Sequence, residues 1–222
     1  MLLALDTSSR TTGLALYDGV QVLSESVWTS RDHHTVELAP SIADMLARAG
    51  TQVAGLEALA VALGPGSFTG LRIGLALAKG LALARQLPLV GIPSLDPLAA
   101  SQPVIAGRLA AVLRAGRGRL ATGWYQAVEG AWQSTKKIEV LTAQELAQRI
   151  QTPTQVCGEL SEEERRVLSR KRKTVLLASP AQSVRRPAFL AELAWSRWQA
   201  GLVDEPATLA PLYLHYNEPI PG

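Results

Sequence analysis

The sequence predicts an α/β protein whose main sheet is partly parallel and covered by helices on both faces. Three short apolar runs near the start, residues 2–7, 14–18 and 20–28, follow one another closely, as the strands of an antiparallel meander do. After them, two segments with helical periodicity alternate with two apolar runs that are typical of buried strands. Such alternation favours parallel strands joined by crossover helices.

The meander leads into a first helix. Asp18-Gly19 stands between the second and third runs and is a strong hairpin signal. Residues 34–49 then place apolar side chains at helical spacing. Pro40 lies inside this pattern and is expected to kink or delay the helix, and Gly50 is expected to end it.

Two more strands and a second helix complete the first half. A buried strand is expected over 57–63, a helix to about Arg85, and a further strand over 87–93. The first half therefore has the order β-β-β-α-β-α-β, with the parallel part at its end.

The second half is less regular. Strands joined by Gly-containing turns are expected over 106–134, and short strands flank the charged helix of 162–173. Thr142 and Glu145 have the spacing of a capping box. Pro187 is positioned to open a last helix, with a glycine just past its end.

The length of 222 residues suffices for one large domain or two small ones. We expect the boundary near residues 94–104, which divides the chain into an N-terminal unit, 1–100, and a C-terminal unit, 101–222. Apolar residues make up 47% and charged residues 18%, so the composition is that of a globular protein with a buried core.

The single cysteine, the N-terminal residues and the length of the apolar stretches indicate a soluble cytoplasmic protein without a membrane partner. Cys157 stands alone, which excludes an internal disulfide and a cysteine-based zinc site. Asp6 interrupts the apolar start, so no signal peptide is expected. The apolar stretch 73–84 is broken by Lys79 and is too short to span a bilayer. A net charge of +3 permits contact with nucleic acid without arguing strongly for it.

A glycine-rich stretch within 62–84 is the most informative motif. Gly64, Gly66 and Gly70 enclose a serine and a threonine, and Leu-Arg follows the third glycine where a P-loop would have Lys and Ser or Thr. A dinucleotide site would need an acidic residue at the end of the next strand, and none occurs before Asp96. What remains is a turn that leads into a helix.

Free N–H groups at a helix start attract anions, so this turn could make a weak phosphate or nucleotide contact. The residues of such a contact would be Asp6, Gly66, Ser67, Thr69 and Arg72. We favour the simpler interpretation, a tight turn in which Ser67, or Thr69, caps the helix.

The helix after the turn is apolar almost all round, which is typical of a buried helix. Gly70, Gly74 and Ala78 recur every four residues and form a small-residue face that a neighbouring helix can approach closely. Either the rest of the chain or a partner must cover it. We predict a partner interface, shared with the first helix, of Leu38, Ile42, Met45, Gly70, Leu71, Gly74, Leu75 and Ala78.

Two segments resemble the TsaB (YeaZ) family. They are LALDTSSRTTGLALYDG at 3–19 and GPGSFTGLRIGLALAKGLA at 64–82, and PLYLH at 211–215 resembles the family's closing segment. The match is long in the N-terminal half and thin in the C-terminal half. The resemblance implies the actin/Hsp70/sugar-kinase-like (ASKHA) fold, with two ribonuclease-H-like domains of which the second is smaller and degenerate.

The resemblance also implies a role in forming threonylcarbamoyladenosine in tRNA, beside the anticodon. In this family the TsaB subunit is not the catalyst. It pairs with its paralogue TsaD, which performs the transfer, and the ATPase TsaE joins them, so tRNA is reached through the complex. Family members self-associate through the first domain, which implies a homodimer for the chain alone. No cofactor is implied for the isolated chain, and ATP or ADP is implied only at a shared subunit interface.

The same resemblance predicts no metal site and no catalytic residue. The catalytic paralogue carries a metal-binding H-x-x-x-H on its first helix, whereas the matching stretch here runs from His34 to Leu38. His33 and His34 are adjacent and would point to different helix faces, and the third histidine lies in the tail. Asp6 sits where kinases and ATPases of this fold place a metal-linked carboxylate, but we favour a role in capping the turn of residues 7–9.

Two basic segments bear on nucleic acid. Many relatives carry an Asp-Ala-Arg segment followed by an acid in the second domain's first hairpin, but residues 114–120 here read RAGRGRL. A function ascribed to those acids does not transfer to this chain. The basic run 165–173 could touch tRNA phosphate, although a solvated helix end is the favoured interpretation.

Alternative functions come from the enzyme class. A small ATP-binding kinase or ATPase of the same fold would need a second phosphate loop, and none is clear in the second half. If the chain were a dinucleotide oxidoreductase, it would bind NAD(P) tightly. A serine hydrolase is disfavoured, because G-x-S-x-G is absent and no acid–His pair is evident near Ser67.

Overall fold

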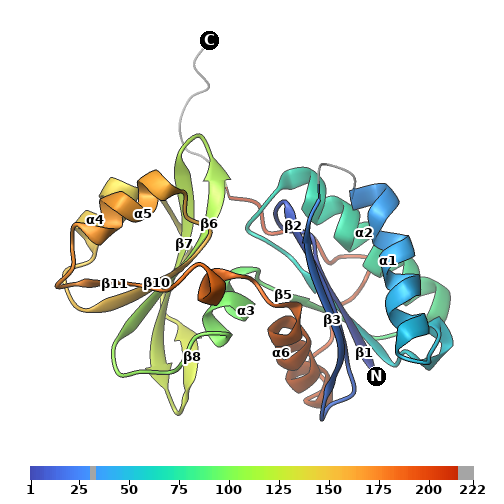
Figure 1. Cartoon of the computed structure of the whole chain (residues 1–222). Coiled ribbons are helices and arrows are strands. Elements are labelled where there is room, and N and C mark those ends of the chain that lie inside the picture. Colours follow the sequence, from blue (N-terminus) through green and yellow to red (C-terminus); the bar gives the residue numbers. More distant parts are fainter. Residues whose placement is uncertain (31–33, 215–222) are drawn as a thin grey trace.

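In the computed structural model, which describes residues 1–30 and 34–214, two sheets lie beside each other with helices packed on them (Figure 1). Each sheet mixes parallel and antiparallel pairs. This is the predicted fold class, an α/β protein of the ASKHA type built from two ribonuclease-H-like sheets.

The first sheet has the strand order β3-β2-β1-β4-β5. β1 pairs antiparallel with β2 and parallel with β4, so the predicted meander and the predicted parallel part share one sheet. Asp18 makes the expected tight turn, with its carboxylate accepting from the N–H groups of Val20 and Gln21. The strands are β1 (Leu2–Asp6), β2 (Thr11–Tyr17), β3 (Val22–Thr29), β4 (Ala58–Ala62) and β5 (Leu89–Ile92).

Helices cover both faces of this sheet. α1 (His34–Arg48) and α2 (Phe68–Arg85) pack on one face, and α6 (Pro187–Gln199) packs on the other (Figure 1). α1 begins before Pro40 and continues past it, so the expected delay of the helix is wrong. Pro40 and Val36 are both exposed, so water can reach the Val36 carbonyl that loses its helical N–H partner.

The second sheet repeats the arrangement of the first. Its strand order is β11-β10-β6-β7-β8, with β9 paired to β7. Read from β6 in chain order, the pattern of antiparallel and parallel neighbours matches that of the first sheet. The strands are β6 (Arg108–Gly116), β7 (Arg119–Val128), β8 (Ala131–Ser134), β9 (Glu139–Leu141), β10 (Thr154–Gly158) and β11 (Val175–Leu177).

Two helices cover the outer face of the second sheet, α4 (Ala143–Arg149) and α5 (Glu162–Ser169). The capping box predicted for α4 is confirmed, because the Thr142 hydroxyl accepts from the Glu145 N–H at 3.2 Å and the Glu145 carboxylate accepts from the Thr142 N–H at 2.7 Å. α5 ends at Ser169, four residues before the predicted end of the charged helix.

A short helix that sequence reasoning missed, α3 (Leu95–Ala100), occupies the expected boundary region. Pro97 is tolerated because it lies in the first turn, where its missing N–H would have no helical partner. Leu95 and Leu98 of α3 pack against the second sheet. α6 comes from the end of the chain yet packs on the first sheet, and the two helices contact each other between the sheets. The division at residue 100 stays a prediction.

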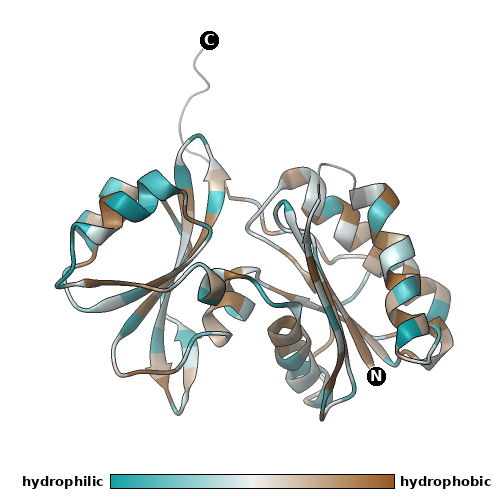
Figure 2. Ribbon diagram, in the orientation of Figure 1, coloured by the Kyte–Doolittle hydropathy of each residue, from teal (hydrophilic) through white to brown (hydrophobic). Residues whose placement is uncertain are grey.

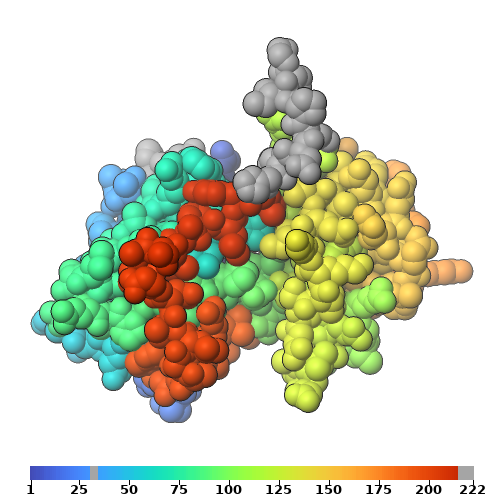
Figure 3. Space-filling view, turned by 180° about the vertical axis from the view of Figure 1, so that it is seen from behind, coloured from blue at the N-terminus to red at the C-terminus, as the bar shows by residue number. Residues whose placement is uncertain are grey.

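The segment after α6 returns across the first unit, seen in red in Figure 3. The Asp204 N–H donates to the Leu89 carbonyl at 2.8 Å, and the Leu212 N–H donates to the Leu63 carbonyl at 2.7 Å. These bonds fasten the segment to the edge strand β5 and to the glycine turn. In the hydropathy colouring of Figure 2, apolar residues follow the strands and the inner sides of the helices. None of the helices in the described ranges is long and apolar enough to cross a membrane.

Candidate functional site

The glycine turn joins β4 to α2 and is held against the loop that follows β1. The Ser67 N–H donates to the Ser8 carbonyl at 2.7 Å, and a Cβ on Gly66 would lie only 2.0 Å from that carbonyl oxygen. The Ser67 hydroxyl accepts from the Gly70 N–H at 3.2 Å and caps α2, as predicted. The tight turn favoured from the sequence is therefore confirmed, with Ser67 rather than Thr69 as the cap.

The small-residue face of α2 packs against this chain rather than against a partner. A Cβ on Gly70 would lie 2.2 Å from the Thr7 carbonyl oxygen, and a Cβ on Gly74 would lie 2.2 Å from the Thr7 hydroxyl oxygen. The Thr7 hydroxyl donates to the Gly70 carbonyl at 2.8 Å. These glycines let the helix approach the loop after β1.

The prediction that these residues form a partner interface is therefore wrong, because it took the buried side of the two helices for the outward side. All eight are buried inside the single chain, because α1 and α2 use that side to cover the first sheet. The eight are Leu38, Ile42, Met45, Gly70, Leu71, Gly74, Leu75 and Ala78.

The opposite side of α1 and α2 is exposed, and much of it is apolar and made of small residues. Leu83 of α2 and Val36 of α1 are each 69% exposed. Seven of the exposed residues of the two helices form what we call the outer helix face: Val36, Ala39, Ala43, Ala47, Ala76, Gly80 and Leu83. Most soluble helices carry charged residues on the side turned away from their core, so an apolar outer face is a candidate contact surface.

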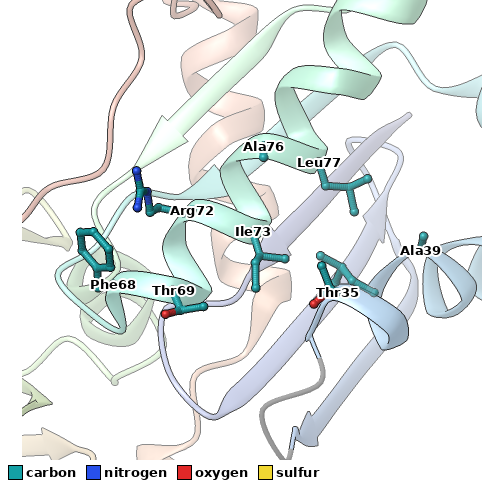
Figure 4. A pocket seen from close by; sticks show the side chains of 9 residues that line it. Thr35, Ala39, Phe68, Thr69, Arg72, Ile73, Ala76 and Leu77 are labelled. Carbon is teal, nitrogen blue, oxygen red and sulfur yellow. The ribbon is translucent and has the colours of Figure 1, made fainter.

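A groove of about 530 Å³ lies between α1 and α2 beside this face. Figure 4 shows Ile73 and Leu77 of α2 turned toward Thr35 of α1, while Phe68 and Arg72 lie near the start of α2. Phe68 is 57% exposed, and the Arg72 guanidinium lies 4.7 Å from the centre of its ring. The groove thus has an apolar floor and an aromatic–arginine pair at one end.

A second and larger pocket, of about 1120 Å³, lies where the two sheets meet. The glycine turn, the loop after β1 and the β6–β7 hairpin line it, and Gly66, Ser67 and Thr69 of the predicted phosphate contact are among the lining residues. Arg72 lines the groove instead, and Asp6 lines neither cavity. The five residues are thus not brought together at one place, and a phosphate contact at the turn stays a prediction.

Asp6 is buried and fully engaged. Its carboxylate accepts from the Ser8 N–H at 2.9 Å and from the Ser8 hydroxyl, which confirms the predicted role in capping the turn. It also forms an ion pair with Arg185 at 2.8 Å. Burial disfavours the charged guanidinium, but Asp6 and Glu159 outweigh this and raise the pKa of Arg185. Sequence reasoning missed Arg185, because it lies 179 residues from Asp6 and no local pattern marks it.

The predicted histidine arrangement is only partly visible. His33 and His215 lie outside the described residues, and His34 starts α1. Leu38, which stands where a second metal ligand would be, is buried in the core of the first unit. Across residues 1–30 and 34–214, no three His, Cys, Asp or Glu side chains gather in a way that could hold a metal ion.

The basic segments lie on the second unit. The β6–β7 turn has positive φ at Gly116, Arg117 and Gly118, and Arg114 beside it is exposed and lines the large pocket. Within α5, the Arg165 guanidinium donates to the Ala178 carbonyl at 2.7 Å, so this side chain is used in holding the helix to the loop after β11. Contact of either segment with tRNA stays a prediction.

A family model, curated proteins and solved structures are all similar to this chain over much of its length. The family model of TsaD, tRNA N6-adenosine threonylcarbamoyltransferase, matches residues 21–187. The chain is 35% identical over 161 residues to the tRNA threonylcarbamoyladenosine biosynthesis protein TsaB of Escherichia coli K12, a match that covers 71% of this chain and 68% of that protein.

It is also 36% identical over 129 residues to the TsaB protein of Bacillus subtilis 168. That match spans 58% of this chain and 56% of the B. subtilis protein. Among solved structures, a Pseudomonas aeruginosa protein described as similar to peptidase YEAZ superposes with a TM-score of 0.79 at 28% identity, covering 96% of this chain and 99% of that one. A second structure, YeaZ of P. aeruginosa, gives a TM-score of 0.76 at 27% identity, with 95% and 99% covered.

Proposed function

The chain belongs to the TsaB (YeaZ) family, whose named members are tRNA threonylcarbamoyladenosine biosynthesis proteins, and from this we propose that it is a non-catalytic subunit of that machinery. In this proposal it binds and activates a TsaD-like transferase through the outer helix face and the adjoining groove. The observation that carries the proposal is that two packed helices turn an apolar face of small residues toward solvent.

The composition of this surface suits a stable protein interface. Small residues let a partner helix approach closely, and Leu83 and Val36 supply apolar area to bury. At the end of the groove, Arg72 is of a residue type that often carries much of the binding energy in interfaces, and Phe68 is of a type enriched there. A second copy of the chain can use the same face, so a homodimer of the chain alone and a complex with the transferase would exclude each other.

The remaining parts of the proposal follow the family. A TsaE-like ATPase joins the pair, tRNA is bound through the complex rather than by this chain, and the chain works in the cytoplasm. ATP or ADP is held only at a shared subunit interface. A small kinase or ATPase is the alternative, and ATP hydrolysis by the pure chain would favour it.

Co-purification with a TsaD-like protein tests the pairing, and tRNA modification assayed with and without this chain tests the role. We expect no modification and no ATP hydrolysis by the chain alone, and modification only when the transferase and the ATPase are present with it. Full modification by the other subunits in the absence of this chain would contradict an activating role.

A matched pair of variants tests the surface. Leu83→Glu places a charge on the outer helix face, and Val20→Glu places one at an equally apolar, 84% exposed position in the β2–β3 turn. Because a buried unpaired charge opposes association, Leu83→Glu should weaken binding of the transferase more than tenfold. Val20→Glu should bind like wild type, and both variants should melt like wild type. Unchanged binding by Leu83→Glu would show that the interface lies elsewhere.

A further inference from the structure

Arg185 lies two residues before α6, at the junction of the two sheets, and its side chain is only 2% exposed. The guanidinium donates to four oxygen groups. Nε donates to the Asp6 carboxylate at 2.8 Å and Nη1 to the Glu159 carboxylate, while Nη2 donates to the Ser9 hydroxyl at 2.9 Å and to the Thr11 carbonyl at 3.2 Å.

The two carboxylates come from different sheets. Asp6 is the last residue of β1 in the first sheet, and Glu159 follows β10 in the second. The Ser9 hydroxyl also donates to Glu159 at 2.6 Å, so the loop after β1 is bound to the second sheet both directly and through the arginine. Without a cation between them, two carboxylates would share a poorly hydrated space and repel each other.

The acceptors around the guanidinium are all oxygen atoms: two carboxylates, a hydroxyl and a backbone carbonyl. A planar guanidinium presents five N–H donors spread over three nitrogen atoms, whereas an ammonium group has three donors on a single nitrogen. Small divalent cations also favour oxygen ligands, but they require a compact coordination shell rather than a planar fork. The spread of the four acceptors over three nitrogen atoms therefore favours a guanidinium.

We propose that Asp6, Glu159, Ser9 and Thr11 form a guanidinium-binding site whose resident ligand is the chain's own Arg185. Occupancy of this site fastens the two sheets to each other at the junction. When the arginine side chain is removed, the vacated site accepts a free guanidinium-type cation. This inference is independent of the proposed function, because it concerns contacts within the single chain.

Chemical rescue tests the site. Arg185→Ala should lower the melting temperature by roughly 6 °C or more, because it leaves a buried carboxylate unpaired. Millimolar methylguanidinium should recover part of that loss in Arg185→Ala and none in wild type, with sodium chloride and methylammonium chloride as controls. The recovery should disappear in Asp6→Asn/Arg185→Ala. Absence of rescue, or equal rescue in the double variant, would overturn the proposal, and so would rescue by Mn²⁺ in place of methylguanidinium.

A second measurement covers the case in which Arg185→Ala does not fold. Asp6→Asn, Arg185→Gln and the double variant form a double-mutant cycle in urea unfolding. We expect the double variant to be less destabilised than the sum of the two single variants. Additive losses would show that the two side chains do not act together, and the proposed site would then be wrong.

Discussion

Thr7 and the glycines of α2 show how single atoms set the distance between two elements. The Thr7 side chain fills the place where a Cβ of Gly74 would be, and its hydroxyl bonds the Gly70 carbonyl. A helix carrying larger residues on this side could not lie so close to the end of β1. The position of α2, and with it the groove beside α1, depends on these two glycines.

Gly74→Ala should therefore lower the free energy of unfolding by about 1–3 kcal/mol, because the added methyl group overpacks against Thr7. Gly80→Ala is the control on the same helix, since nothing lies within 4 Å of its Cβ position. The control should be stabilising by about 0.5–1 kcal/mol through the higher helix propensity of alanine. Urea unfolding of both variants checks this, and equal effects would contradict the close packing.

Asp96 is a second residue whose setting has a measurable consequence. Burial raises the pKa of its carboxyl, although the O–H of Tyr125, which donates to it at 2.7 Å, and the nearby Arg197 oppose the rise. Because the folded state holds this proton more tightly than the unfolded state does, ionisation of Asp96 reduces stability as the pH rises through the folded-state pKa. At neutral pH the ionised carboxylate of Asp96 therefore lowers the free energy of unfolding.

Asp96→Asn should accordingly be more stable than wild type at neutral pH. The difference in free energy of unfolding should shrink as the pH falls through the folded-state pKa of Asp96, and it should level off once the pH is below its unfolded-state pKa. Urea unfolding of both proteins across the acidic range measures this. A difference that stays constant with pH would show that Asp96 does not titrate in this way.

Among the elements, the ends of the helices are fixed by short local signals. Ser67 caps α2, Thr142 and Ser161 cap α4 and α5 with complete capping boxes, and Pro187 opens α6 at its first turn. Each of these works within three or four residues of the chain, so the sequence alone is enough to recognise it. For α2 the cap also fixes where the helix starts relative to the large pocket.

Ser67→Ala should lower the free energy of unfolding by about 1 kcal/mol, because it removes the side-chain acceptor of the Gly70 N–H. Ser67→Asp should keep most of the stability, because a carboxylate can accept the same bond and interacts well with a helix start. Thermal unfolding of the two variants gives the comparison. If Ser67→Asp is as unstable as Ser67→Ala, the cap is not what stabilises the turn.

Over the whole molecule, the two sheets have the same strand order, but only the first receives a covering helix from a distant part of the chain. α3 precedes the second sheet and covers it, while α6 follows the second sheet and covers the first. The core of the first sheet is therefore completed by a helix that follows the second sheet in the chain.

A fragment of residues 1–104 should consequently fail to fold by itself. It lacks α6, which packs on Leu2, Ala60 and Val90, and uncovering a leucine or valine costs about 1.5–3 kcal/mol against a total stability of about 5–15 kcal/mol. Co-expression with a peptide of residues 179–214 should restore solubility. Circular dichroism and size exclusion check this, and a cooperatively folded 1–104 fragment would show that α6 is dispensable.

The sequence predicted most strands and most helices correctly, because hydrophobic periodicity and caps are local; it missed β9 and α3. Two features could not be obtained this way. The outward side of α2 was not identified, because the helix is apolar almost all round and Arg72 and Lys79 mark only a narrow polar stripe. The pairing of Arg185 with Asp6 depends on the packing of segments 179 residues apart, and neither residue has a neighbour pattern that reveals it.

The return of α6 to the first sheet also has a consequence for protein synthesis. A ribosome makes residues 1–92, the whole of the first sheet, well before it makes 187–199. Until then the nascent chain carries an uncovered sheet face of leucine, alanine and valine, which is a surface that chaperones bind and that favours aggregation. The first sheet is thus the first to be synthesised and the last to be covered, and emergence of α6, rather than emergence of the first half of the chain, sets the moment at which this sheet can fold.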